Sequence, residues 1–175
     1  MAGPLKRPQD FRQWTAFLIA TALGAGLTPK APGTAGSLVA LPIPILVRNL
    51  DFSTRALLWC GLTFLGIWAA REWDQFQRSS DNQSIVIDEV VGLWLTAWTA
   101  TQWSTLLVAF VLFRFFDVLK IPPVRQVDRW SKKKAGENTP SSAWWGGFGV
   151  VADDVLAGVQ GLIIIVLLQK WGILP

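Results

Sequence analysis

The stretch Ser84-Ile-Val-Ile-Asp88-Glu89-Val-Val-Gly92-Leu-Trp-Leu95 places two adjacent acids at the start of a run that is otherwise apolar enough to enter a bilayer. Ionised carboxylates in such surroundings are costly unless a cation meets them. Acids recur in similar surroundings as Asp117 and as the pair Asp153-Asp154. We therefore expect the three acid clusters to converge on one metal-phosphate site, which the apolar chain holds together.

The composition is typical of a small integral membrane protein. The 175 residues are 51% hydrophobic, include 11 Trp and have a positive mean hydropathy, and this length fits one membrane-embedded domain, residues 1–175. The formal charge is +4, but the basic residues lie beside apolar segments and form no stripe with spaced aromatics. We expect anionic membrane lipids as partners and no nucleic acid.

Missing residue types restrict the possible chemistry. The chain has no His, which excludes phosphohistidine intermediates, Ser-His triads and His-ligated zinc. The single thiol, Cys60, lies inside an apolar run, so no internal disulfide can form and we expect a packing residue, not a nucleophile. Oxygen ligands remain, and these are the ligands that Mg²⁺ prefers.

The apolar runs predict an all-α fold, a compact integral-membrane helical bundle of about four to five apolar helices plus a short N-terminal helix. The runs are long and lack the alternation of a strand. The N-terminal helix is expected within Phe11–Leu27, on or dipping into the membrane, with a cleaved signal peptide as the less favoured alternative. The apolar runs are Leu38–Leu50, Ala56–Ala70, Ile85–Trp103, Leu106–Leu119 and Val150–Leu174.

Charge predicts the orientation of these runs. Basic residues are dense in the N-terminal segment and in Lys120–Lys134, so both are expected in the cytoplasm, with Lys132–Lys134 in a solvated loop near anionic lipid. If the five apolar runs alternate in direction, all three acid clusters fall at cytoplasmic ends. The charge count does not require this agreement, which therefore supports a single site.

Three charged residues near the end of the fourth apolar run are expected to share one helix face. Arg114, Asp117 and Lys120 are spaced three apart, so each cation lies one turn from the acid. A buried ion-pair ladder would have the same spacing, but the neighbouring acid clusters favour a functional site. The prolines that follow stop the helix and leave Arg125 free to reach back.

Small residues follow the acids at helical spacing. Gly92 lies one turn after Glu89 and Gly158 one turn after Asp154, so another helix can approach each acid closely. Adjacent helix residues point about 100° apart, so one acid of each pair is expected to bind metal while its neighbour orients water or a second ion. For a single pair, acids favoured by a helix dipole are the alternative explanation.

The segment Pro32-Gly33-Thr34-Ala35-Gly36-Ser37 is expected to form a loop before an apolar helix. Its amides and the hydroxyls of Thr34 and Ser37 could cradle a phosphate. It lacks the Gly-Lys-Ser/Thr element of a P-loop, and a plain interhelical loop is the alternative.

Four linked motifs, in order between about Gly24 and Gly161, resemble the phosphatidylglycerophosphatase A family. They are Gly24-x-Gly26-Leu-x-Pro29-x-x-Pro32-Gly33-Thr34-x-Gly36-Ser37, Ile87-Asp88-Glu89-x-x-Gly92, Phe113-Arg114-x-x-Asp117-x-x-Lys120 and Gly147-x-Gly149-x-x-x-Asp153-Asp154-x-x-Ala157-Gly158. The chain departs from the family pattern where Ile121, not Pro, follows Lys120, and where Ser131–Trp145 is longer than usual.

The resemblance implies a Mg²⁺-dependent phosphatase of the bacterial inner (cytoplasmic) membrane, multi-pass and with its active site facing the cytoplasm. It would convert phosphatidylglycerophosphate to phosphatidylglycerol and inorganic phosphate, by attack of a metal-bound water or of an Asp nucleophile. The expected metal ligands are Asp88, Glu89, Asp117, Asp153 and Asp154, of which Asp88, Glu89, Asp117 and Asp154 are the candidate catalytic residues. The expected phosphate-binding residues are Thr34, Ser37, Arg114, Lys120 and Arg125.

Other functional classes make different predictions. A transporter or ion channel would distribute its acids through the depth of the membrane, and a non-catalytic scaffold would pair its charges so that acid-to-amide changes alter only stability. A CDP-alcohol phosphotransferase would also use acids and Mg²⁺, but its Asp-Gly-x-x-Ala-Arg signature is absent. The sequence leaves the oligomeric state open.

Overall fold

The computed structural model describes residues 5–79, 82–137 and 142–175, and over these residues the chain is helical without a β-strand. The expected all-α class is therefore confirmed. In chain order the elements are α1 (Phe11–Ala20), the 3₁₀ turn η1 (Ala25–Leu27), α2 (Pro32–Ala40), α3 (Pro42–Val47), α4 (Phe52–Gln77), α5 (Ile87–Thr96), α6 (Trp103–Leu119), α7 (Val124–Ala135) and α8 (Ser142–Lys170).

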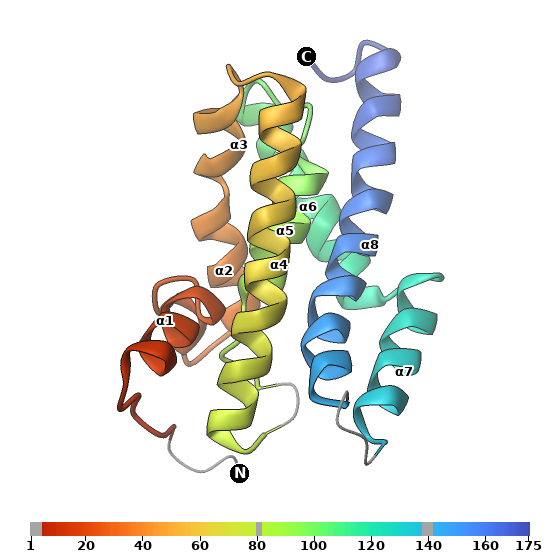
Figure 1. The fold of residues 1–175 in the computed structure, drawn as a ribbon. Helices are drawn as coiled ribbons and strands as arrows, with labels where there is room; N and C mark the ends of the chain where they lie inside the picture. Colours follow the sequence, from red (N-terminus) through yellow and green to blue (C-terminus); the bar gives the residue numbers. More distant parts are fainter. Residues whose placement is uncertain (1–4, 80–81, 138–141) are drawn as a thin grey trace.

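Two long helices, α4 and α8, pack side by side along the height of the bundle (Figure 1). Both are long and apolar enough to cross a membrane. Only 11% of the apolar part of α4 is buried inside the protein, unlike a core helix of a soluble protein. An apolar surface that the protein leaves uncovered favours contact with another apolar medium.

The single thiol lies on this uncovered surface. Cys60 is exposed on α4, so the expectation of a residue packed inside the protein was wrong. An apolar run predicts burial only where other parts of the protein cover it, and most of the apolar part of α4 is uncovered.

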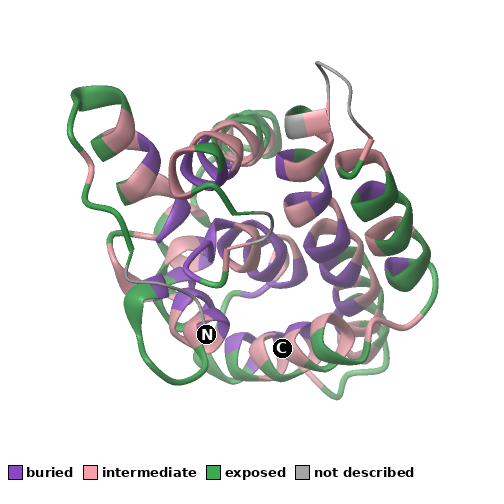
Figure 2. Cartoon of the chain, turned by 90° about the horizontal axis from the view of Figure 1, so that it is seen from below, coloured by how far each residue is buried: buried purple, intermediate pink, exposed green. Residues whose placement is uncertain are grey.

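The centre of the bundle is the short helix α5. The apolar run Ile85–Trp103 was expected to form one helix, but α5 has 10 residues and is about 15 Å long, too short to span a bilayer. Most of its residues are buried, and α2, α4, α6 and α8 all pack against it. Buried residues gather on the sides of the helices that face the middle of the bundle (Figure 2).

Close contact between α5 and α8 depends on two glycines. A Cβ atom at Gly158 would lie 2.6 Å from the carbonyl oxygen of Gly92, and one at Gly92 would lie 2.7 Å from the carbonyl oxygen of Asp154. The expected close approach of another helix at these small residues is confirmed. Small residues allow helix backbones to approach closely, and the resulting van der Waals contacts hold helices together where the hydrophobic effect between them is weak, as it is in lipid.

The segment Pro32–Ser37 forms the first turns of α2 and not the expected loop. Proline is favoured in the first turn because its fixed φ suits a helix and its missing N–H would have had no partner there. The glycines serve close packing instead of a turn. A Cβ atom at Gly36 would lie 2.6 Å from Cβ of Val86, and one at Gly33 would overlap Oε1 of Glu89.

The basic segment after α6, which was expected to be a loop, contains the helix α7. Its buried residues are Val124 and Ser131, and it packs against the first half of α8. Lys132, Lys133 and Lys134 lie in its last turn, where cations interact favourably with the helix dipole. Helix α7 is mostly polar, so a search for apolar runs does not detect it.

Candidate active site

The three acid clusters meet in one cavity of about 620 Å³. It lies where the C-terminal ends of α4 and α6, the N-terminal end of α5, helix α7 and the first half of α8 come together. The expected acids all line it: Asp88, Glu89, Asp117, Asp153 and Asp154. The expected convergence of the clusters is therefore confirmed, while their roles stay predictions.

The glycine crossing of α5 and α8 brings these acids together. Glu89 lies one turn before Gly92 on α5, and Asp154 lies one turn before Gly158 on α8. Because the two glycines are in contact, the acids preceding them are carried to the same level of the bundle. The first-turn position on α5 also suits carboxylates because of the helix dipole.

Three of the acids have the geometry of a cation site. One carboxylate oxygen each from Asp88, Glu89 and Asp154 lies within 4.8 Å of the others. Four buried oxygens, Asp88 Oδ1, Glu89 Oε2, Asp153 Oδ1 and Asp154 Oδ2, accept no hydrogen bond from the described part of the chain. Buried carboxylate oxygens without donors are costly, and a hard divalent cation would compensate them.

Arg114 of α6 contacts two of the acids and lies next to the start of α2. Its Nη1 lies 2.8 Å from Oδ2 of Asp117 and 3.6 Å from Oε1 of Glu89. A Cβ atom at Gly33 would lie 3.0 Å from the same Nη1. Arg114 is not among the residues that line the cavity, so it is placed to hold Glu89 and Asp117 in position.

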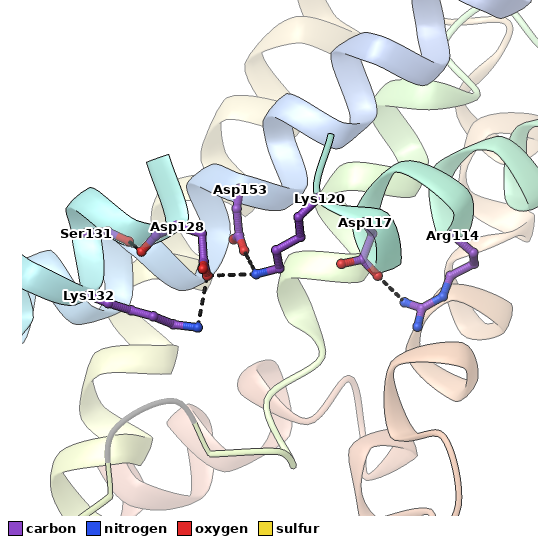
Figure 3. A network of polar contacts seen from close by, with 7 residues as sticks. All are labelled: Arg114, Asp117, Lys120, Asp128, Ser131, Lys132 and Asp153. Atoms are coloured by element: carbon purple, nitrogen blue, oxygen red, sulfur yellow. Dashed lines mark hydrogen bonds and ion pairs between the residues drawn. The ribbon is translucent and has the colours of Figure 1, made fainter. Parts of the chain in front are cut away.

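Lys120 is held at the cavity wall by two acids. Its Nζ donates to Oδ2 of Asp153 at 2.6 Å and to Oδ1 of Asp128 at 2.7 Å (Figure 3). Burial alone would lower the pKa of Lys120, but the Asp153 and Asp128 carboxylates outweigh it and raise its pKa above the ordinary value. The ammonium therefore remains charged at neutral pH.

Asp128 joins Lys120 to α7. Lys132 Nζ lies 2.9 Å from Oδ1 of Asp128, and the Ser131 hydroxyl donates to the Asp128 carbonyl at 3.0 Å (Figure 3). Burial raises the pKa of Asp128, but the hydrogen bonds from Lys120 and Lys132 outweigh it and leave its pKa below the ordinary value. The carboxylate stays ionised and fixes both lysines.

The structure places one of the expected phosphate-binding residues in the cavity wall and the others outside it. Lys120 lines the cavity, whereas Thr34, Ser37 and Arg125 are not among its lining residues. The buried Ser37 hydroxyl donates to the Gly33 carbonyl at 2.9 Å, and Arg125 is exposed on α7. The start of α2 thus contacts the acid Glu89 and gives no direct indication of a phosphate cradle.

Several cavity residues were missed in the sequence. Asp128, Ser131 and Lys132 come from α7, and the i, i+4 spacing of Asp128 and Lys132 was the available signal for a helix there. Lys132 had been expected in a solvated loop. Arg71 of α4 also lines the cavity, and its signal was a charge directly after the apolar run that ends at Ala70.

Comparisons with known proteins identify relatives over most of the chain. The family model described as phosphatidylglycerophosphatase A matches residues 18–169. A phosphatidylglycerophosphatase A of Haemophilus influenzae is 36% identical, with 88% of each chain covered, and that of Escherichia coli is 33% identical over 81% of this chain and 76% of the relative.

A third relative has a different name. A Bacteroides thetaiotaomicron protein, named provisionally as a phosphatidylinositol-3-phosphatase, is 36% identical over 95% of this chain and 98% of its own. No solved structure matches the chain significantly.

Proposed function

The chain belongs to the phosphatidylglycerophosphatase A family, and from this we propose that it is a lipid phosphatase that converts phosphatidylglycerophosphate to phosphatidylglycerol and inorganic phosphate. The observation that carries the proposal is the meeting of five acids in one cavity at one end of an apolar bundle. The Bacteroides relative favours phosphatidylinositol 3-phosphate as a second candidate substrate. Both lipids carry a phosphomonoester on the head group.

We propose Mg²⁺ as the cofactor, held by Asp88, Glu89 and Asp154 with Asp117 and Asp153 beside them. The support is the oxygen-only donor set and the four buried oxygens without hydrogen-bond donors. A bound divalent ion supplies charge neutralisation of the phosphate and a more acidic water at neutral pH.

The chain's own residues have separate parts in this proposal. Lys120, fixed by Asp128 and Asp153, faces the cavity and neutralises a phosphate oxygen. Arg114 holds Glu89 and Asp117 in position through its contacts with their carboxylates. We propose direct attack by water in line with the leaving oxygen.

We propose that the protein is multi-pass in the bacterial inner membrane, with the cavity facing the cytoplasm. Helices α4 and α8 supply spans by length and composition. Lys132 of α7 lines the cavity, and the basic last turn of this helix agrees with the positive-inside rule for that end of the bundle. The lipid tails of the substrate then stay in the bilayer while its head group enters the cavity, and anionic lipids border the basic end.

The geometry favours a phosphatase over the rival classes. The acids gather at one end, whereas a transport pathway would distribute them through the membrane depth. A scaffold would pair its charges, but buried oxygens of four acids have no donor among the described residues.

The test is release of inorganic phosphate by the purified protein in mixed micelles. Phosphatidylglycerophosphate, phosphatidylinositol 3-phosphate and phosphatidic acid would each be supplied with Mg²⁺ or with a chelator. We expect the first lipid to be hydrolysed fastest and the chelator to abolish release. Preferred hydrolysis of the inositol lipid would replace the substrate assignment, and turnover unaffected by the chelator would overturn the cofactor assignment.

A further inference from the structure

Arg71 lines the cavity but belongs to none of the acid clusters. Its guanidinium carbon lies 4.2 Å from the ring centroid of Trp144, and its Nη1 donates to Oε1 of Glu72 at 3.1 Å. Its Nε is buried and donates to no acceptor in the described residues. A buried donor without an acceptor costs free energy, and the side chain as a whole is 20% exposed, so Arg71 is suited to an anion that enters the cavity.

A second guanidinium contacts the carboxylate to which Arg71 is bonded, and the nearby Asp74 of the cavity wall accepts from Ser79 and Asn82. Glu72 is shared between Arg71 and Arg12, whose Nη2 lies 2.8 Å from the same Oε1. Two guanidinium groups thus face one carboxylate. The other cations among the described cavity residues, Lys120 and Lys132, both contact Asp128.

Arg71 lies away from the acids, toward the end of the cavity formed by the C-terminal end of α4. A Cβ atom at Gly147 of α8 would lie 3.0 Å from Cβ of Arg71, so the two helices touch there. Asp154 follows Gly147 by seven residues, which is two helical turns on the same face and about 10 Å along α8. The Arg71 guanidinium stacks on Trp144, which precedes Gly147 by three residues and so lies still farther from Asp154 along the helix.

We propose that Arg71 binds phosphate oxygens at a second subsite of the cavity, separate from the acid cluster. The planar guanidinium suits paired phosphate oxygens, and stacking on Trp144 reduces the freedom it would lose on binding. The inference rests on the proposed function, which supplies two sources of such oxygens. They are inorganic phosphate leaving the site and the phosphodiester of the lipid head group.

The first experiment measures phosphate binding without turnover. Wild-type protein, Arg71→Gln and Arg12→Gln would be titrated with inorganic phosphate in a chelator, and thermal unfolding would be followed. With divalent ions removed, the acids repel phosphate, so binding reports on the second subsite. We expect phosphate to raise the Tm of wild type and Arg12→Gln. The phosphate affinity derived from these Tm shifts should be about tenfold lower in Arg71→Gln.

Arg12→Gln is the matched control because Arg12 contacts the same Glu72 oxygen but does not line the cavity. If Arg71→Gln does not fold, Arg71→Lys serves instead. Its phosphate affinity should be measurable but lower than that of wild type, because lysine keeps the charge but lacks the planar fork. Equal stabilisation of all variants by phosphate, or none of wild type, would overturn the proposal.

Kinetics then distinguish the two phosphate sources. A higher inhibition constant for inorganic phosphate with an unchanged KM assigns the subsite to the leaving product. A higher KM for phosphatidylglycerophosphate but not for phosphatidic acid, which has no phosphodiester, assigns it to the head group. An equal loss of kcat on both lipids with KM and inhibition unchanged would refute the subsite, while inactivity of the wild type would refute the proposed function and leave the binding result standing.

Discussion

At the residue scale, the important observation is that four acids keep a buried oxygen without a hydrogen-bond donor. Folding normally pairs such atoms, so their grouping in one cluster supports the proposed cation site over a stabilising network. The surrounding cations do not remove the deficit, because Arg114 is directed at Asp117 and Glu89 while Lys120 is directed at Asp153 and Asp128.

Asp154→Asn should separate catalysis from stability. We expect phosphate release to fall about a hundredfold or more, because one oxygen of the cation site is replaced by an amide. The metal-free variant should unfold at a higher temperature than metal-free wild type, because one member of a repelling cluster becomes neutral. Activity assays and thermal unfolding in a chelator check both points, and undiminished turnover would remove Asp154 from the site.

Gly33→Ala should impair the site through a neighbour. The added methyl overlaps the Glu89 carboxylate, and a displacement of about 1 Å at a catalytic group can cost about a hundredfold in rate. Gly36→Ala is the matched comparison, since its methyl meets Val86 instead. We expect both to lower Tm but only Gly33→Ala to lose activity in the folded protein. Equal activities in the two folded variants would contradict this role of Gly33.

At the scale of elements, the site depends on one helix crossing. Helices α5 and α8 meet where Gly92 and Gly158 touch, and each carries its acids one turn before the contact. The distance between the two helix axes therefore sets the distance between Glu89 and Asp154. Helix α7 contributes a different element, a polar wall that closes the cavity and supplies Asp128.

Gly158→Ala should separate the acids. Its Cβ atom would lie 2.6 Å from the Gly92 carbonyl, so α8 must shift, and we expect a loss of about 1–3 kcal/mol in the free energy of unfolding. Phosphate release and Mg²⁺ affinity should fall together. Gly61→Ala on α4 is the control, because nothing lies within 4 Å of its added methyl. Wild-type Mg²⁺ affinity in Gly158→Ala would show that the crossing does not set the site.

The sequence predicted apolar elements better than polar ones. Apolar runs indicated α4, α6 and α8, and the acids within them indicated a shared cavity. Helix α7 was missed because its helical character lies in amphipathic spacing and not in hydropathy. Gly33 and Gly36 favour a turn at the start of α2, so their sequence predicts a loop there. Only the packed structure shows that Glu89 and Val86 lie against these glycines.

At the scale of the whole molecule, the uncovered apolar sides and the polar cavity end define an orientation. Large exposed apolar residues lie on the outer faces of several long helices, such as Phe64 of α4, Val111 of α6 and Ile163 of α8. These surfaces would be unfavourable in water. The cavity end, by contrast, carries the basic last turn of α7.

Thiol labelling should report this orientation. In native membranes, Cys60 should react with a hydrophobic maleimide and resist a charged, membrane-impermeant one, because its exposed position on α4 would face lipid. In the Cys60→Ala background, Arg129→Cys on α7 should react with the charged reagent in inside-out vesicles but not in right-side-out vesicles. Labelling of Arg129→Cys from the outer face would reverse the proposed topology.

Helix α8 is a single element of 29 residues that carries apolar side chains in its C-terminal half and Asp153 and Asp154 in its N-terminal half. A host bilayer with longer or shorter acyl chains changes the tilt of such a helix through hydrophobic mismatch. Because the helix has no break between its halves, a change in its tilt would also displace the carboxylates of Asp153 and Asp154. Turnover should therefore vary with the thickness of the surrounding lipid even when the substrate molecule is unchanged.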